Sequence, residues 1–288
     1  MNVIEESLFK TGAIRCSNEG APFWYTSGTI GPFFINTHFL YGGENESNLL
    51  LDFIDKNISD KSDFPARLTK TVTDFYTNNE LFNKAINLFY DEIKINPSFQ
   101  DASYISGGER RDWIFSIPIS YLSDKPHLFI FKDLSVYSTE KKIEDVRNSK
   151  VAHIADLITQ ASSYERAWIP AIKKINGEIV FSGSIVDRMQ GGAEFLKKSG
   201  IESYSSVFIN DSFFNNAKNA ALITENQYQS IKDFTRNSIE YGKSFLTKNI
   251  DFLKESLNST NKSTKDKATR CVSENPYSIN FDSFGIKI

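Results

Sequence analysis

The chain has 288 residues, of which 40% are hydrophobic, and a formal net charge of −3. This length can bury a full-sized core, in one large domain or two modest ones. The slightly acidic balance argues against a general polyanion-binding surface, so we expect no nucleic acid partner. The only cysteines, Cys16 and Cys271, lie far apart without zinc-ligand spacing, which argues against a disulfide framework or structural zinc.

The N-terminal residues lack a basic segment followed by an apolar run, so we expect no secretory signal. No stretch approaches the roughly eighteen consecutive apolar residues that a membrane span needs. We therefore expect a cytoplasmic protein with reduced thiols and no contact with membranes.

Helical and strand patterns alternate from about residue 80 onward. Residues 79–93 carry Leu81, Phe82, Ala85 and Leu88 at helical spacing, which predicts an amphipathic helix. Apolar, β-branched runs predict strands at 102–107, 127–131, 151–155, 179–186 and 206–209. Such runs, alternating with helices, indicate an α/β fold with a mostly parallel sheet covered on both faces. Ligands of such sheets bind beyond the carboxyl ends of the strands.

Further helices are predicted at 162–177 and 191–200. Ser162 or Ser163 would cap the first of these helices, and Pro170 must lie in its first turns or bend it. Residues 228–257 predict a long amphipathic helix, or a helix pair broken at Gly242. Residues 258–270 are polar enough for a mobile linker, and residues 276–288 are apolar enough to dock back.

The first strand end is dense in charge and contains two glycines. Gly107 and Gly108 are followed by Glu109, Arg110 and Arg111. One interpretation is a solvated surface loop. The other is an anion site, because glycines permit close backbone approach and paired arginines suit phosphate or carboxylate. Both interpretations stay open at this point.

The next two strand ends are also polar. Residues 132–150 are long and poor in apolar side chains, so we expect 133–149 to be mobile or an exposed hairpin without ligand. In the segment VAHIADLITQASSYERAW, Asp156 lies at the strand tip and a turn of small and hydroxyl residues precedes a helix. That turn either binds an anion through free N–H groups or only caps the helix.

The fourth strand end carries a resemblance to a known family. Asp187-Arg188, followed by Gly191-Gly192 and a helix, resembles the type I phosphoribosyltransferases, in particular the orotate phosphoribosyltransferases. The segments FKTGAIR and FWYTSGTIGPFFIN, and residues 151–163, are similar to further motifs of this family in the same order. The resemblance spans roughly residues 5 to 210. It implies a phosphoribosyltransferase-like domain with an N-terminal hood over 1–215 and a C-terminal helical extension and tail over 216–288.

The resemblance also implies the site. Phosphoribosyl pyrophosphate would contact Gly108, Arg110, Arg111, Asp156, Thr159, Gln160, Ala161, Ser162 and Ser163. The base would contact Thr26, Phe33, Phe34 and Arg188. Lid cations Lys132, Lys141 and Lys142 would act with Asp156 in catalysis. Mg²⁺ would bind through the substrate rather than to a direct protein ligand, and the protein would be a homodimer.

Several positions depart from the family pattern. Ala155 takes the place of the first acid before the turn, and Thr26 takes the place of a lysine that contacts orotate. The lid lacks the usual Lys-x-His pattern, and the turn lacks its usual glycine. Two functions therefore stay open. One is transfer of ribose 5-phosphate to a base, orotate giving orotidine monophosphate in pyrimidine biosynthesis. The other is a catalytically weak relative that binds nucleotide or phosphoribosyl pyrophosphate to regulate another process.

Overall fold

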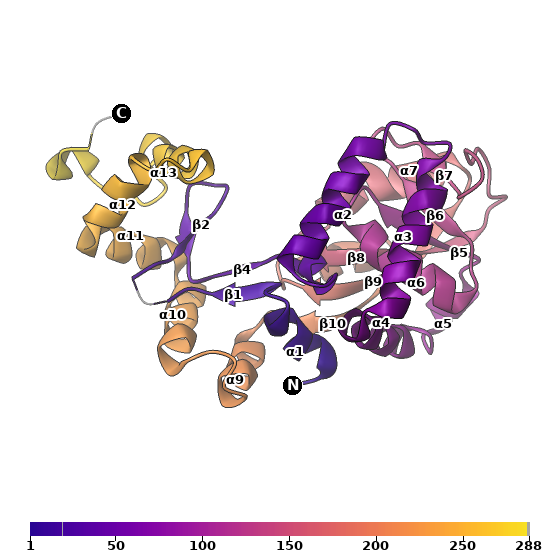
Figure 1. Ribbon diagram of the computed structural model, residues 1–288, viewed down its shortest axis with the longest axis horizontal. Coiled ribbons are helices and arrows are strands. Elements are labelled where there is room, and N and C mark those ends of the chain that lie inside the picture. Colours follow the sequence, from indigo (N-terminus) through magenta and orange to yellow (C-terminus); the bar gives the residue numbers. More distant parts are fainter. Residues whose placement is uncertain (19, 287–288) are drawn as a thin grey trace. The chain divides into compact units, whose positions relative to one another are not determined.

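The computed structural model describes residues 1–18 and 20–286, and the chain forms two compact units. The first unit comprises Met1–Ala13 and Asn36–Phe213, and the second comprises Ile14–Ile35 and Phe214–Ile288 (Figure 1). This division differs from the predicted one because the segment at 14–35 packs with the C-terminal helices. No helix in the described ranges has the length and apolarity to cross a lipid bilayer.

The first unit is built on a six-stranded sheet with the order β10-β9-β8-β5-β6-β7. Its strands are β5 (Tyr104–Gly108), β6 (His127–Ile130), β7 (Val136–Tyr137), β8 (Lys150–Ile158), β9 (Glu178–Asp187) and β10 (Glu202–Phe208). The five longer strands are parallel, and β7 pairs antiparallel with β6. All five predicted strands are confirmed, as is the mostly parallel sheet.

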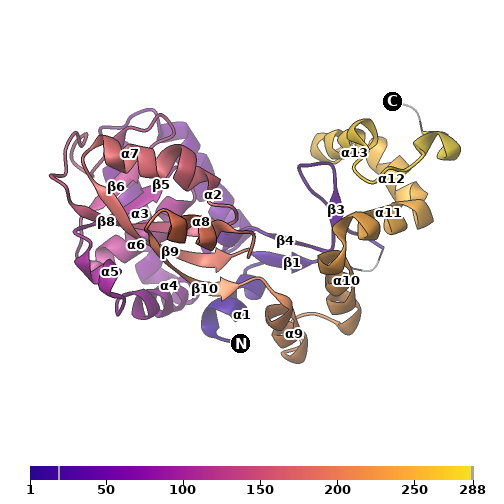
Figure 2. The same cartoon turned by 180° about the vertical axis from the view of Figure 1, so that it is seen from behind.

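Helices cover both faces of this sheet (Figures 1 and 2). On one face, α6 (Asp112–Ser123) packs on β5 and β8 and is backed by α3 (Phe64–Asn78) and α4 (Glu80–Ile93). On the other face lie α7 (Ile169–Lys174) and α8 (Gly192–Lys198). The remaining helices of this unit are α1 (Val3–Lys10), η1 (Thr37–Leu40), α2 (Glu44–Asn57) and α5 (Pro97–Asp101).

The polar segment between β6 and β8 forms a hairpin, as expected. Tyr137 pairs with Lys142 across it, and Ile143 donates its N–H to Val136. The hairpin tip is exposed, but Val136 and Val146 are buried in the apolar cluster beneath α7. These two valines anchor both ends of the segment to the first unit.

The second unit combines short strand pairs with helices. Strands β1 (Ile14–Cys16) and β4 (Phe33–Ile35) form one antiparallel pair, and β2 (Phe23–Trp24) and β3 (Ile30–Gly31) form another. The helices are α10 (Glu225–Arg236), α11 (Ser238–Lys248), α12 (Ile250–Leu257), α13 (Lys262–Glu274) and η3 (Phe281–Phe284). Helix α9 (Asp211–Asn219) carries the chain from the first unit to the second.

Two predictions for the C-terminal region are wrong. The helix over 228–257 breaks at Asn237 and Asn249, whereas Gly242 lies inside α11. Asn237 has an extended backbone and its side chain caps α11 by accepting the N–H of Glu240. Gly242 instead allows close packing, because a Cβ there would lie 2.2 Å from the ring of Tyr277.

The predicted mobile linker over 258–270 is the second error, because most of it belongs to α13. Asn261 caps this helix by accepting the N–H of Thr264 at 3.1 Å, and Ala268 and Cys271 are fully buried. Most side chains of α13 are polar, so the sequence pattern did not reveal the few apolar residues through which this helix packs. The docking of 276–288 is confirmed through buried residues such as Tyr277 and Phe281, while 287–288 lie outside the described residues.

Tyr277 joins the N-terminal strands of this unit to its helices. Its hydroxyl accepts the N–H of Ile30 at 2.7 Å in a buried setting. We expect Tyr277→Phe to lower the free energy of unfolding of the second unit by about 1–3 kcal/mol, because the N–H of Ile30 loses its acceptor. Urea unfolding followed by Trp24 fluorescence, in a variant lacking the other tryptophans, would measure this loss. Tyr121→Phe, at an exposed hydroxyl, is the control and should change stability little.

Candidate functional site

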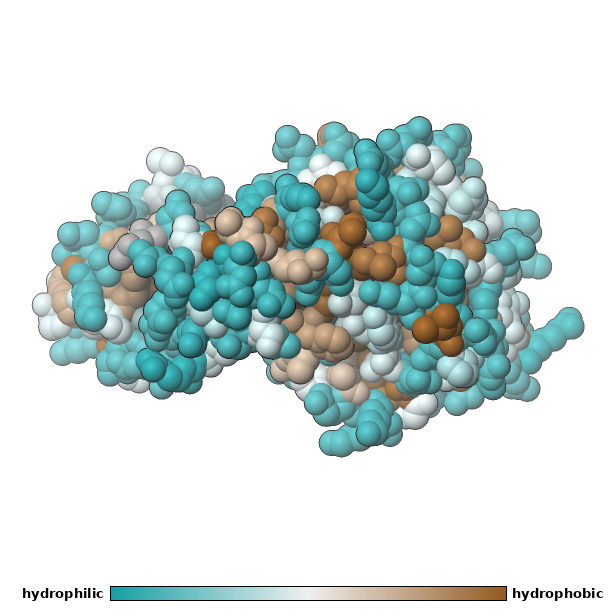
Figure 3. Space-filling model, turned by 90° about the horizontal axis from the view of Figure 1, so that it is seen from below, coloured by the Kyte–Doolittle hydropathy of each residue, from teal (hydrophilic) through white to brown (hydrophobic). Residues whose placement is uncertain are grey.

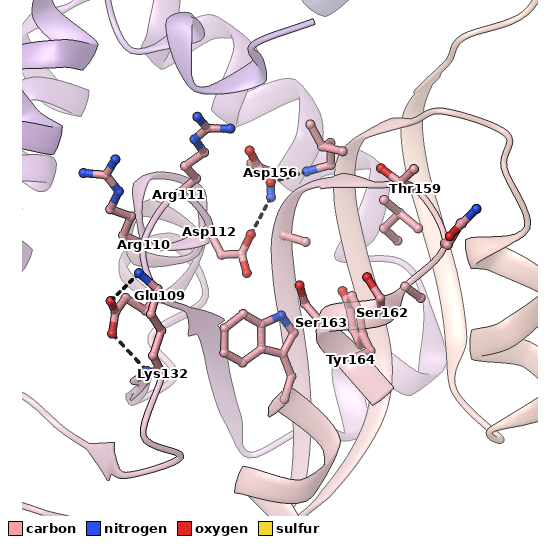
Figure 4. Close-up of a pocket in the computed structure, with 16 residues that line it drawn as sticks. Glu109, Arg110, Arg111, Asp112, Lys132, Asp156, Thr159, Ser162, Ser163 and Tyr164 are labelled. Carbon is pink, nitrogen blue, oxygen red and sulfur yellow. Dashed lines mark hydrogen bonds and ion pairs between the residues drawn. The ribbon is translucent and has the colours of Figure 1, made fainter. Parts of the chain in front are cut away.

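A cavity of about 400 Å³ opens where β5 and β8 end (Figure 4). It is lined by Glu109, Arg110, Arg111, Asp112, Lys132, Ala155, Asp156, Leu157, Ile158, Thr159, Gln160, Ala161, Ser162, Ser163, Tyr164 and Trp168. The lining contains most of the residues predicted to contact phosphoribosyl pyrophosphate. The loop after the first strand and the turn after the third therefore line the same cavity. The sequence alone did not show that these two segments lie together.

The topology of the sheet explains the position of the cavity. From β5 the chain passes through α6 to β6 on one side, and from β8 it passes through α7 to β9 on the other side. The pairing of β5 with β8 ends at Ser106 and His153. Beyond this pair the two strands diverge, which is the topological switch point where open α/β sheets bind ligands.

The polar turn forms one wall of the cavity. Ala161 has a positive φ of 55°, and a helical segment begins at Ser162 with a π-helical turn, η2 (Tyr164–Trp168), before α7. Within the described residues, the N–H groups of Gln160 and Ala161 donate to no protein acceptor. Free N–H groups beside the hydroxyls of Ser162 and Ser163 make this turn suitable for a phosphate group.

Gly192, the second glycine after the fourth strand of the resemblance, supports this turn together with the backbone of Arg188. Gly192 donates its N–H to the carbonyl of Thr159 at 3.0 Å, and Arg188 donates its N–H to Ile158 at 2.9 Å. A Cβ at Gly192 would lie 2.2 Å from Ile158 Cγ2 and 2.8 Å from the Thr159 carbonyl oxygen. Only glycine therefore lets α8 approach the turn this closely.

Three cations line the opposite wall, and they differ in their partners. Arg110 forms an ion pair with Asp55 and donates to the carbonyl of Leu51. Lys132 pairs with Glu109 at 3.2 Å. Arg111 is exposed, and its guanidinium makes no hydrogen bond or ion pair with any described residue. Among the described residues, Arg111 is thus the cation of this cavity whose side chain has no protein partner.

Asp156 is a buried carboxyl at the centre of the cavity. Its Oδ1 accepts the N–H of Leu157 at 2.7 Å, whereas its Oδ2 is buried without a partner among the described residues. Burial, with the negative charge of Asp112 as the second cause, raises the pKa of Asp156 to about 8, although Arg111 opposes the shift. The pKa of Asp156 therefore lies well above the usual range of an aspartate carboxyl, which favours its protonated form relative to an exposed aspartate.

Two lining residues had no assigned role in the sequence. These residues are Asp112, which follows the charged loop directly, and Trp168. Trp168 lies so close to Gly108 that a Cβ on the glycine would be 2.2 Å from its ring. Because 60 residues separate this pair, no local pattern could have revealed the contact. His153 is fully buried, and its Nδ1 shares a hydrogen bond with Ser106 Oγ at 2.9 Å, as is usual for a histidine in a protein core.

The remaining predicted residues do not line the cavity. Lys141 and Lys142 are exposed on the hairpin, where Lys142 pairs with Glu144. Arg188 is half-buried and forms no ion pair with a described residue. The three N-terminal residues assigned to the base, Thr26, Phe33 and Phe34, belong to the second unit. Their roles stay predictions.

Phe33 and Phe34 lie among aromatic rings of that second unit. The ring of Phe33 packs 4.8 Å from that of Phe214, and the ring of Phe34 packs 4.8 Å from that of Phe23. The Thr26 carbonyl accepts a hydrogen bond from Arg270. These contacts give each of the three residues a structural role within its own unit.

Direct metal binding has little support in the described ranges, which contain no group of three or more His, Cys, Asp or Glu side chains placed to hold a metal ion. The unpartnered oxygen of Asp156 is one available ligand atom, and it belongs to a group whose pKa is raised by burial.

Comparisons with known proteins place this geometry in a class. No family model matches the chain. It is 29% identical over 144 residues to an orotate phosphoribosyltransferase of Methanosphaera stadtmanae, covering 49% of this chain and 76% of that protein. It is also 29% identical over 134 residues to an orotate phosphoribosyltransferase of Pyrococcus abyssi, covering 45% of this chain and 73% of that protein.

Solved structures agree with the fold. The orotate phosphoribosyltransferase of Francisella tularensis superposes with a TM-score of 0.53 at 15% identity, covering 82% of this chain and 98% of that one. The UMP synthase of Leishmania donovani gives a TM-score of 0.55 at 16% identity over 80% of this chain but only 41% of its own length. The chain thus has the type I phosphoribosyltransferase fold. It is a divergent, distant relative of the orotate phosphoribosyltransferases.

The raised pKa of Asp156 predicts a dependence of stability on pH. Folding retains a proton that the unfolded chain releases above its ordinary pKa of about 4, so this group lowers stability as pH rises from about 4 to about 8. Asp156→Asn removes the effect. We expect the melting temperature of the variant to exceed that of the wild type by a few degrees at pH 8 and by little at pH 4.

Calorimetric melting across this range, with exposed Asp52→Asn as control, would measure the difference. A constant gap between wild type and Asp156→Asn at every pH would contradict the assignment of a raised pKa.

The contact between Gly192 and the turn gives another prediction. We expect Gly192→Ala to destabilise the first unit by about 1–3 kcal/mol, because the added methyl meets Ile158 and the Thr159 carbonyl. The displaced turn should also bind inorganic phosphate more weakly, as measured by calorimetric titration. Gly200→Ala is the control, because at a φ of +76° with open space around it the variant loses stability through backbone strain without a clash at the turn. Equal phosphate binding by both variants would show that Gly192 does not support the turn.

Proposed function

We propose that the protein binds phosphoribosyl pyrophosphate in this cavity and transfers its ribose 5-phosphate to a nucleobase, orotate giving orotidine monophosphate. The observation that carries the proposal is the pairing of two anion-binding elements in one cavity. The turn at 159–163 offers free N–H groups and hydroxyls, and Arg111 offers a free guanidinium on the other wall. A ligand with a phosphate at one end and a pyrophosphate at the other suits this arrangement.

The chemistry asks for positioning and charge neutralisation. The bond between the anomeric carbon and pyrophosphate breaks, and a bond from that carbon to a base nitrogen forms, through an oxocarbenium-like transition state. The turn would hold the 5-phosphate, Arg111 and Lys132 would neutralise the leaving pyrophosphate, and Asp156 would contact a ribose hydroxyl. Magnesium bound by substrate oxygens would supply Lewis acid chemistry to the leaving group.

The identity of the base rests on the distant relatives, which are named orotate phosphoribosyltransferases. Arg188 of the first unit would pair its guanidinium fork with pyrimidine oxygens. The base contacts of Thr26, Phe33 and Phe34 rest on the family resemblance alone. The exposed hairpin with Lys141 and Lys142 would close over pyrophosphate as a lid. All of these roles belong to the proposal.

A second function is favoured by specific features of the cavity. Ala155 replaces the first acid, burial raises the pKa of Asp156, and two of the three lining cations already have partners. A protein that binds phosphoribosyl pyrophosphate or nucleotide without efficient turnover fits these features, and it would serve in regulation.

One pair of measurements separates the two functions. Depletion of orotate, followed by absorbance with Mg²⁺ and phosphoribosyl pyrophosphate, supports the transferase. Calorimetric binding of phosphoribosyl pyrophosphate without depletion of orotate or any other nucleobase supports the regulator. Absence of both binding and depletion would contradict the proposed function.

The unequal partners of the two arginines predict unequal effects. We expect Arg111→Ala to weaken binding of phosphoribosyl pyrophosphate by about 10- to 100-fold, because a charge-assisted hydrogen bond is lost. Arg110→Ala should weaken it much less, since Arg110 is occupied by Asp55 and Leu51. Calorimetric titration of both variants gives the comparison, and the reverse order would contradict the assignment of Arg111.

A further inference from the structure

Asp112 joins the two strands at the point where they diverge. The pairing of β5 with β8 ends at Ser106 and His153. Beyond it, the N–H of Gly108 donates to Asp112 Oδ2 at 3.2 Å, and the N–H of Asp156 donates to Asp112 Oδ1 at 3.0 Å. One carboxylate thus bridges the backbones of both strands across the gap.

This bridge is not an ordinary helix cap. Asp112 is the first residue of α6, where an acidic side chain commonly serves the N–H groups of its own helix. Here both carboxylate oxygens instead accept N–H groups from outside the helix. The side chain is also nearly buried, with 8% of the residue exposed, so both hydrogen bonds lie in a poorly solvated setting.

His153 and its neighbours pack around the Asp112 bridge. His153 Nε2 lies 3.5 Å from Asp112 Oδ2, and His153 Nδ1 lies 2.9 Å from Ser106 Oγ. The imidazole stacks on Trp168 at 5.9 Å between ring centroids and meets the edge of Tyr164 at 4.9 Å. The histidine thus lies between Ser106 and the carboxylate of Asp112, and its Nε2 makes no hydrogen bond with a described residue.

Asp112 also adds an acidic group that the sequence motif lacks. The strand position next to Asp156 holds Ala155, so the motif itself supplies one carboxyl to the cavity. Asp112 lines the same cavity from α6 and lies close enough to Asp156 for their carboxyl groups to interact. The cavity therefore contains two neighbouring carboxyl groups, one from the sheet and one from the helix beside it.

We infer that Asp112 is a positioning residue of this site: its carboxylate sets the backbone of the 108–111 loop against Asp156, and thereby sets the pyrophosphate wall against the ribose contact. The inference rests on the proposed function. Asp112 acts through Gly108 and Asp156, so its loss should weaken binding of phosphoribosyl pyrophosphate while sparing contacts to the base.

The experiment compares Asp112→Ala and Asp112→Asn with a matched control outside the cavity. Asn96 is the control, because its Oδ1 also accepts two backbone N–H groups, those of Ser98 and Phe99, at the opposite end of β5. Asn96→Ala should lose stability as Asp112→Ala does and retain affinity for phosphoribosyl pyrophosphate. Asp112→Asn keeps the side-chain shape but can accept only one of the two N–H groups well.

We expect Asp112→Ala to raise the dissociation constant for phosphoribosyl pyrophosphate with Mg²⁺ by about 10- to 100-fold, and Asp112→Asn to raise it less. In steady-state assays the KM for this donor should rise, while the KM for orotate changes less than about threefold. Where Asp112→Ala does not fold, Asp112→Asn carries the test, with a rise of about threefold or more expected.

The outcomes separate the two claims. Wild-type binding with unchanged affinity in the Asp112 variants would overturn the inference and leave the proposed function standing. An equal loss of affinity in Asn96→Ala would also overturn it, because the effect would then follow from stability. Absence of binding by the wild type would overturn the proposed function and the inference with it.

Discussion

The divergence of β5 and β8 beyond Ser106 and His153 is the constraint on which the site depends. The chain leaves β5 for one face of the sheet and β8 for the other, so no crossover covers the gap between the strand ends. Backbone N–H and carbonyl groups that would be hydrogen-bonded if the two strands stayed paired are unpaired with each other there. Some are satisfied by Asp112, and those of the turn at 160–161 are left for a ligand.

Close packing around this gap requires small residues at defined positions. Gly108 lies under the indole of Trp168, and Gly192 lies under the turn that follows β8. Each glycine is needed because a neighbouring element occupies the space of a Cβ, rather than because its backbone requires a positive φ. The positions of the two cavity walls therefore depend on close packing within the first unit as well as on the sequences of the loops.

The cavity contains both buried acidic groups and cations, and these differ in whether they have partners within the protein. Two neighbouring carboxyl groups are buried at its centre, and burial together with the charge of Asp112 raises the pKa of Asp156. Among the described residues the guanidinium of Arg111 has no acidic partner, while Arg110 and Lys132 are paired with acids of the protein. A raised pKa reduces the negative charge that Asp156 would present to an anionic ligand, and Arg111 would offer that ligand a cation.

Local sequence patterns were sufficient to predict the α/β class, the five parallel strands and the helix that precedes them, because apolar runs and helical spacing are local signals. They also located the polar turn at 159–163 and the charged loop at 108–111, since each follows a strand directly. The sequence patterns did not predict the helix boundaries at Asn237 and Asn249, nor did they predict α13. Those features depend on caps and on a narrow buried stripe that local polarity conceals.

The packing of distant elements determines which charged residues share the cavity. It paired Arg110 with Asp55, left Arg111 free, and brought Asp112 to the backbones of Gly108 and Asp156. It also grouped residues 14–35 with the C-terminal helices through contacts such as that of Tyr277 with Ile30. These relations join residues up to 247 positions apart. Hydrogen bonding and burial at such separations are set by how the elements pack, which no local sequence pattern specifies.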